Sequence, residues 1–242
     1  MVNLPTDHQL SDDPAASKLP RYAANVVRQQ GRQWIVRNNG DRLPSVTTIL
    51  NATRSVDQLE ALVAWRQRVG AAAAAQIAST ASRRGIGTHR QIQHFLEGQP
   101  VDCPPTVKPY WDSFLPLLQT LQPVRLVEGY VFHDDLHYAG QVDCIATYQG
   151  IPCVCEWKTA DRPKGSIDRL YDYPLQLAAY CGAVNATYAE YNLNITHALL
   201  VVGIPHQPAE VFWFPPAQLA PYWQQWHQRL DMYHRLQSPI TL

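Results

Sequence analysis

The amino-acid sequence predicts an α/β fold in which helices flank a mixed central sheet. Helix-forming residues dominate the chain up to residue 121, alternation of apolar and polar residues begins at residue 124, and a helix and two further strands follow. The 242 residues, 46% of them hydrophobic, suffice for one core of ordinary size and exclude a wholly disordered chain. No apolar run approaches the roughly 18 residues that a membrane-spanning helix requires.

The first half of the sequence predicts an arm, a short strand and a helical region. Residues 1–20 contain three prolines and three aspartates, which is typical of a flexible arm, and residues 21–242 then form a single domain. Asn39-Gly40 is a typical hairpin turn, and Gly85 and Gly87 are expected to interrupt the helical region. The expected elements are a strand over 32–37, a strand or helix entry over 42–50, and helices over 55–82, 88–97 and 106–121.

The second half predicts three consecutive strands, a helix, two more strands and a last helix. Asp134-Asp135 and Gln149-Gly150 supply the first turns, and Pro174 suits the start of the next helix. The domain therefore divides into a helical part over 54–121, a sheet core over 124–214 and an amphipathic C-terminal helix over 218–236. The strands are expected over 124–132, 141–148, 151–157, 198–204 and 210–214, and the helix between them over 174–180.

The charged residues are unevenly distributed although the formal net charge is zero. Residues 1–100 contain 12 Lys and Arg against 7 Asp and Glu, whereas residues 101–242 contain 8 against 13. Six arginines lie between positions 54 and 90, and the planar arginine side chain suits phosphate oxygens. A basic half beside an acidic half is typical of an enzyme that combines a carboxylate metal site with a polyanionic substrate.

One predicted hairpin carries the residues that indicate chemistry. A two-residue turn at 149–150 brings Asp143 directly opposite Glu156 on the flanking strands, and Lys158 shares the face of Glu156. Two adjacent carboxylates repel and are costly to bury, so a divalent cation would stabilise them, and oxygen ligands favour Mg²⁺ or Mn²⁺ over zinc. A metal beside an ammonium group suits phosphodiester hydrolysis. The alternative is a solvated strand end with an incidental salt bridge.

These residues resemble the signature of the PD-(D/E)XK nuclease superfamily, with Asp143 on one strand and Glu156-x-Lys158 on the next. Val142 stands where the signature has proline. The RecB-type branch is similar in three further blocks, which are a Gly-x-x-x-His element ending at His89, a glutamate on the first strand, and a Gln-x-x-x-Tyr helix. Most similar within the branch are the mitochondrial genome-maintenance exonucleases, which have counterparts over roughly 40–236 to LPSVT, RGIGTH, VDCIATYQG, WKT and PLQLAAY.

The resemblance implies a restriction-endonuclease-like core and a role for each matching residue. Asp143, Glu156 and Lys158 would be catalytic, with Lys158 serving the attacking water. Gln176 and Tyr180, one helical turn apart, would touch the scissile phosphate or orient Lys158. The metal ligands would be His89, Asp143, Glu156 and the carbonyl of Trp157. The substrate-binding residues would be Gln176, Tyr180, Glu128, Arg83 and Arg84.

Two departures from the branch bear on the site. Gln93 stands where the family helix usually has an acid, four residues after His89. The cysteine quartet that binds an iron–sulfur cluster in some relatives has no counterpart in spacing, so no cluster is expected, and the five cysteines are interpreted as reduced core thiols.

The resemblance implies a Mg²⁺-dependent deoxyribonuclease, with Mn²⁺ able to substitute. It would degrade single-stranded DNA from free ends in DNA repair, recombination or replication-end processing. Trp65, Tyr110 and Trp111 would stack on bases or belong to the core. The alternatives are a lambda-type duplex exonuclease, a flap endonuclease and, from another class, a nucleic-acid-binding protein with a vestigial site.

The remaining expectations concern location and partners. The first twenty residues contain neither an apolar nor an arginine-rich targeting segment, which favours a bacterial-type cytoplasmic location. The expected partner is single-stranded DNA, without membrane association, and the expected state is a monomer. The residues do not indicate which replication or repair proteins bind it.

Overall fold

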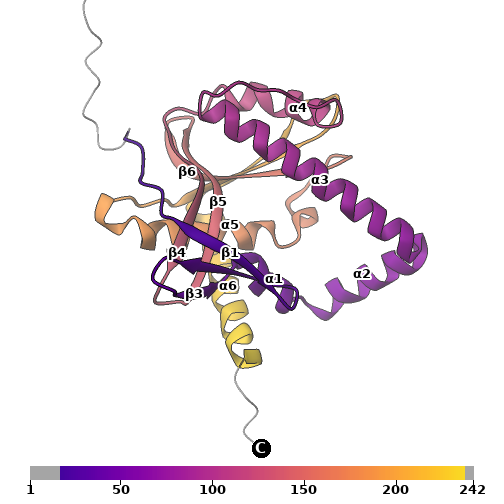
Figure 1. Cartoon of the computed structure of the whole chain (residues 1–242), viewed down its shortest axis with the longest axis horizontal. Helices are drawn as coiled ribbons and strands as arrows, with labels where there is room; N and C mark the ends of the chain where they lie inside the picture. The colour runs from indigo at the N-terminus through magenta and orange to yellow at the C-terminus, as the bar shows by residue number, and fades with distance from the viewer. Residues whose placement is uncertain (1–16, 238–242) are drawn as a thin grey trace, which may run out of the picture.

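Figure 1 shows the computed structural model, which describes residues 17–237. Most of the predicted arm, residues 1–16, lies outside the described residues; Leu19 near its end is buried, and its N–H donates to the carbonyl of Arg125 at 2.9 Å. In chain order the elements are β1 (Ala24–Gln29), β2 (Arg32–Arg37), β3 (Arg42–Pro44), α1 (Val46–Ala52), α2 (Val56–Val69), α3 (Ala71–Leu96), α4 (Lys108–Leu118), β4 (Val124–His133), β5 (Tyr138–Tyr148), β6 (Ile151–Thr159), the short 3₁₀ helix η1 (Ile167–Leu170), α5 (Tyr173–Thr187), η2 (Ala189–Tyr191), β7 (His197–Gly203), β8 (Glu210–Phe214) and α6 (Pro216–Gln237).

Five strands form the central sheet in the order β4-β5-β6-β7-β8. The strands β4, β5 and β6 are antiparallel neighbours, β6 and β7 are parallel, and β7 and β8 are antiparallel. The parallel pair arises because α5 crosses over between β6 and β7, whereas short connections join the other neighbours. The predicted mixed sheet, with three antiparallel strands and further strands beside them, is therefore confirmed.

Helices cover both faces of this sheet, so β7 is apolar on both sides. Leu200 and Val202 belong to the core that contains α1, α5 and α6, whereas Leu199 and Val201 pack with α3 and α4. Figure 1 shows α4 and α6 on opposite sides of the sheet. Among residues 17–237, no helix is long and apolar enough to cross a membrane.

A second sheet of three antiparallel strands, β1-β2-β3, lies against the β4–β5 hairpin. Ile35 and Leu43 from its inner face pack on Phe132 and Ala139. The sequence does not predict β1. Five of its six residues are exposed, so the alternation that indicates a half-buried strand is missing.

The helical part breaks at a different place from the prediction. The helix expected over 55–82 is wrong, because α2 ends before Gly70 and α3 then continues through both Gly85 and Gly87. Gly70 has a φ of +85°, a conformation that residues with side chains avoid. Gly87 instead allows a close helix contact, since a β-carbon there would lie 2.6 Å from Cγ2 of Val107.

Most other predicted elements are confirmed with small shifts at their ends. The strands β2 and β8 match the prediction, α4 is shorter than the expected 106–121, and α6 is slightly longer than 218–236. Helix α5 runs on from the expected end at residue 180 to Thr187, because its contacts with the core continue through Val184.

The two glycines of α3 provide a test of this packing. We expect Gly85→Ala to raise the free energy of unfolding by up to about 1 kcal/mol, because alanine is the better helix former and the added methyl group meets no atom within 4 Å. Gly87→Ala should gain nothing or lose about 1 kcal/mol, since its methyl group would overlap Val107. Urea unfolding followed by circular dichroism measures both. Equal stabilisation by the two substitutions would contradict the close approach of Val107.

Candidate metal centre and active site

The β5–β6 hairpin sets the two predicted acids side by side. The pairing of Cys144 with Cys155 follows the register predicted from the two-residue turn. The next facing positions along the two strands are Asp143 and Glu156, which are both buried. Here the backbone ladder ends, and the N–H of Trp157 donates to Asp143 Oδ2 at 2.7 Å instead. The predicted register is therefore confirmed.

Strand β4 adds a third carboxylate to this row. The pairs on either side of it place Glu128 level with Asp143. Glu128 has a φ of +50°, which is uncommon for a residue with a side chain and is typical of functional positions. Its Oε2 accepts a hydrogen bond from Gln141 Nε2 at 2.9 Å, which fixes the carboxylate.

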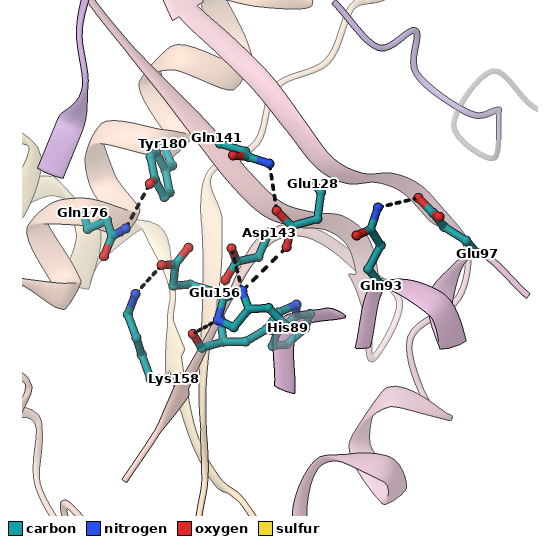
Figure 2. A network of polar contacts seen from close by, with 11 residues as sticks. His89, Gln93, Glu97, Glu128, Gln141, Asp143, Glu156, Lys158, Gln176 and Tyr180 are labelled. Carbon is teal, nitrogen blue, oxygen red and sulfur yellow. Dashed lines mark hydrogen bonds and ion pairs between the residues drawn. The ribbon is translucent and has the colours of Figure 1, made fainter. Parts of the chain in front are cut away.

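His89 reaches the carboxylates from helix α3, which packs on the other face of the sheet (Figure 2). Its Nε2 lies 2.9 Å from the carbonyl of Trp157 and donates to it, because a carbonyl can only accept. Nδ1 then faces the acids, at 3.4 Å from Asp143 Oδ1 and 3.6 Å from Glu128 Oε1. All three ligand atoms lie within 4.8 Å of one another, so one cation between them would contact all three.

Asp143 and His89 hold each other in their charged forms. Burial alone would lower the pKa of His89, but the charges of Asp143 and Glu128 outweigh burial and raise this pKa well above 6.5. Burial would likewise raise the pKa of Asp143, and His89, Lys158 and the Trp157 N–H together lower it below 3.8. Protonated His89 therefore supplies a positive charge that a bound cation would replace.

Glu156 and Lys158 form a buried ion pair beside this cluster. Lys158 Nζ donates to Glu156 Oε1 at 2.5 Å and lies 4.9 Å from the centre of the Tyr173 ring. Burial, followed by the charge of Asp143, raises the pKa of Glu156 to about 8. Its second oxygen, Oε2, is buried without a hydrogen-bond partner among the described residues. Because a buried oxygen without a partner is costly, this atom is a candidate ligand for a cation.

Helix α5 places Gln176 and Tyr180 one turn apart over the same face. Gln176 Nε2 donates to the Tyr180 hydroxyl at 2.9 Å, and Figure 2 shows the pair beyond Glu156 on the side away from His89. The Tyr180 ring packs on Gly140, where a β-carbon would lie 2.4 Å from the ring. Burial, followed by the charge of Glu156, raises the pKa of Tyr180, so its hydroxyl keeps its proton.

Trp157 connects the site through its backbone. Its ring lies on the opposite face of the sheet, in edge contact with Phe114, while its N–H reaches Asp143 and its carbonyl accepts from His89. In this arrangement the carbonyl contacts the imidazole rather than the carboxylates. The structure therefore places Trp157 as the group that orients His89.

The two predicted arginines lie outside the carboxylate cluster. Arg83 is exposed on α3. Arg84 turns to the segment after β6, where it donates to Asp161 Oδ1 at 2.5 Å and to Thr159 Oγ1 at 3.2 Å. Its guanidinium also covers the Tyr110 ring, 4.6 Å from the centroid. Arg84 therefore ties α3 to the end of β6 that carries Lys158.

Four of the five cysteines, and two of the three aromatic residues considered for base stacking, are buried in the core. All five cysteines are free thiols, and four of them are buried. Tyr110 and Trp111 are 8% and 6% exposed, so they belong to the core rather than to a surface that stacks on bases.

The sequence predicts Glu128 only as a substrate contact, not as a neighbour of His89 and Asp143. The strands predicted over 124–132 and 141–148 leave the length of the loop between them open, so they do not define which residues face each other. In the structure the loop spans residues 134–137, and this length sets Glu128 level with Asp143. Loop length therefore decided this position. Tyr173 beside Lys158 is also missed, because a tyrosine at the start of a helix carries no signal of its own.

The mixed sheet, the facing acids, the histidine from a preceding helix and the adjacent lysine are consistent with the PD-(D/E)XK-like class of nucleases. The chain is similar to proteins named mitochondrial genome maintenance exonuclease 1. It is 32% identical to the Mus musculus protein over 207 residues, which is 82% of this chain and 61% of the relative. The Homo sapiens protein is also 32% identical over 200 residues, which is 79% of this chain and 58% of the relative.

The chain thus spans about three fifths of the length of these curated relatives. No protein-family model matches the chain. A solved structure of a candidate exonuclease from Eubacterium rectale aligns over 63% of this chain and 65% of its own, with a TM-score of 0.44 and 9% identity. The resemblance indicated by the sequence motifs is confirmed by the curated relatives.

The expectation of a bacterial-type cytoplasmic location is wrong. The matching proteins of Mus musculus, Homo sapiens and Xenopus tropicalis are all named as mitochondrial. The expectation depended only on the composition of the first twenty residues. That composition does not indicate which proteins the rest of the chain is related to.

The raised pKa of Glu156 predicts how stability depends on pH in the presence of a chelator. Between pH 4.5, its ordinary pKa, and about 8, the folded protein keeps a proton on Glu156 that the unfolded chain releases. The free energy of unfolding should therefore fall as pH rises through this window, by at most about 1.4 kcal/mol per pH unit.

Glu156→Gln removes this titration, so its stability should fall less steeply with pH than that of the wild type. Denaturant unfolding at several pH values measures the slope, with exposed Glu60→Gln as the control. Identical slopes for the wild type and Glu156→Gln would show that the Glu156 carboxyl titrates normally.

Proposed function

We propose that this protein is a metal-dependent nuclease that hydrolyses the phosphodiester bonds of single-stranded DNA from free ends. The observation that carries the proposal is the convergence of His89, Glu128 and Asp143 beside the Glu156–Lys158 pair. The similarity to mitochondrial genome maintenance exonuclease 1 supports the proposed nuclease activity. The proposed setting is DNA repair, recombination or replication-end processing, and the proposed state is a monomer.

The proposed cofactor is Mg²⁺, for which Mn²⁺ would substitute. His89, Asp143 and Glu156 would hold the ion, and Glu128, which converges with His89 and Asp143, would be a further ligand. The unpartnered oxygen of Glu156 supports including Glu156 among the ligands. Trp157 would contribute by orienting His89. A ligand set of carboxylates and one imidazole favours these ions over those that prefer thiolates. When bound, such an ion polarises a phosphoryl oxygen and lowers the pKa of a bound water.

The chain's own residues would handle the water and the phosphate. Lys158 lies at the edge of the cluster and would orient the attacking water, since its ammonium donates three hydrogen bonds and only one is used by Glu156. Gln176 and the Tyr180 hydroxyl would contact the scissile phosphate. The raised pKa of Tyr180 keeps that hydroxyl available as a donor next to an anionic substrate.

Helices α2 and α3 supply the basic surface that a DNA strand requires. Figure 1 shows the two helices leaving the body of the molecule and meeting at one side, where Gly70 joins them. Five arginines of this region are exposed and would contact phosphates beside the site. These residues are Arg66, Arg68, Arg83 and Arg90, with Arg54 just before α2. We expect a DNA strand to follow the arginines of α2 and α3 toward the carboxylates. Because Asp143 and Glu156 are buried, the strand would reach them with a free end first.

The first prediction concerns the metal. Asp143→Asn keeps an acceptor for the Trp157 N–H but removes the charge, so we expect Mn²⁺ affinity to fall more than about 100-fold and cleavage to be lost while the fold is retained. Calorimetry, a nuclease assay and circular dichroism measure these effects. Asp231→Asn, exposed on α6, is the matched control. Cleavage in excess EDTA would contradict metal dependence.

The second prediction separates catalysis from binding. Lys158→Met should lower the single-turnover rate by about 10²–10⁴-fold, because water orientation is lost, while affinity for a single strand changes little. Lys108→Met, an exposed lysine on α4, should alter neither. A parallel loss of rate and affinity in Lys158→Met would mean that Lys158 chiefly binds substrate.

The third prediction concerns the substrate. A linear single strand should be digested, whereas its circular form and the matching blunt duplex should resist under the same Mg²⁺ and salt. Rapid cleavage of the circle would make the protein an endonuclease, and preference for the duplex would favour the lambda-type reading. Binding to the linear strand should weaken with salt with a slope of about −0.7 per phosphate contacted.

A further inference from the structure

A cavity of about 760 Å³ lies between α2 and the segment that leads into α5. Its walls combine aromatic rings with arginines, from parts of the chain more than a hundred residues apart. The rings are Trp65, Tyr171 and Tyr173, and the arginines are Arg54 and Arg68. Both arginines are exposed, and Arg54 is held by a hydrogen bond of 2.6 Å to Asn51.

This pocket is adjacent to the proposed active site, because two of its lining residues contact residues of that site. Tyr173 forms part of its wall and also lies 4.9 Å from Lys158 Nζ. Gln176 lines it as well and donates to Tyr180 inside the site, as Figure 2 shows. If one phosphate of a nucleic-acid strand lies at the carboxylates, the adjacent nucleotide therefore lies near the pocket.

Tyr171 at the edge of the pocket has an unusual backbone. Its φ of 52° and ψ of −123° form a combination that glycine adopts readily and a bulky residue does not. Tyr171 is 72% exposed although its neighbour Leu170 is fully buried. Such strain persists only where the surroundings impose it, and it clusters at functional sites.

The residue after Tyr171 provides that constraint. Asp172 accepts hydrogen bonds from Gln58 of α2 at 3.1 Å and from Arg229 of α6 at 3.3 Å. The same side chain therefore joins the turn that carries Tyr171 to the first turn of α2, the helix that also carries Trp65 of the pocket lining. The contacts of Asp172 thus connect the two parts of the chain that supply the pocket's rings.

We propose that this pocket takes a nucleobase of the single strand, next to the nucleotide whose phosphate is cleaved, and that the Tyr171 ring is the surface on which the base stacks. Arg54 and Arg68 contact the adjoining phosphates. This inference rests on the proposed nuclease function. It commits to a nucleobase because a flat apolar ring bordered by arginines matches a base joined to phosphates, and stacking on an aromatic ring accepts every base.

The test compares two strands in the presence of EDTA, so that binding is measured without cleavage. A fluorescent thymidine oligonucleotide and an abasic strand of the same length are titrated with the full chain by anisotropy. The wild type should bind the thymidine strand about tenfold more tightly than the abasic strand. Tyr171→Gly should lose this preference, and Tyr171→Phe, which keeps the ring, should retain it.

Stability distinguishes a functional ring from a structural one. Because glycine relieves the backbone strain, Tyr171→Gly should unfold at the same or a higher temperature than the wild type. Tyr191→Ala, which removes an exposed tyrosine outside the pocket, should leave binding of both strands unchanged. If Tyr171→Gly keeps the preference for bases, or if the wild type has none, the pocket proposal is wrong while the nuclease proposal stands. If the wild type neither binds nor cuts single strands, the proposed function itself fails.

Discussion

Repulsion between like charges is the constraint on which the site depends. Glu128, Asp143 and Glu156 occupy level positions on the neighbouring strands β4, β5 and β6, and carboxylates held this close oppose one another's ionisation. Among residues 17–237, two cationic side chains, His89 and Lys158, form ion pairs with them. Three acids against two cations leave a deficit of positive charge. Burial and, after it, the charge of Asp143 raise the pKa of Glu156. A divalent ion would supply the missing positive charge.

Backbone groups position the charged side chains of the site as much as other side chains do. Trp157 sits on a strand with partners on both sides, so its N–H and carbonyl are fixed in space and position Asp143 and His89 respectively. Its ring, buried on the opposite face, prevents the strand from rotating. Arg84 then ties α3 to the segment after β6 through Asp161. The helix that carries the histidine and the strand that carries the acids are therefore connected at two points.

Two features that do not favour folding lie on α2 and just before α5, where the proposed DNA strand would bind. Helix α2 has no buried residue, although Val56, Leu59 and Val63 are apolar. Tyr171 has a strained backbone and an exposed ring. Neither feature stabilises the fold, and both belong to the surface proposed to bind bases and phosphates.

The sequence by itself determined the strands of the sheet and the pairing of Asp143 with Glu156, because alternation and a two-residue turn are local properties that set a register. It did not determine where the helical part breaks, since Gly70, Gly85 and Gly87 are alike in sequence and differ only in backbone conformation and contacts with distant residues such as Val107. It also could not place Glu128 beside His89. That contact depends on a loop length and on a helix crossing from the other face, and only tertiary packing decides both.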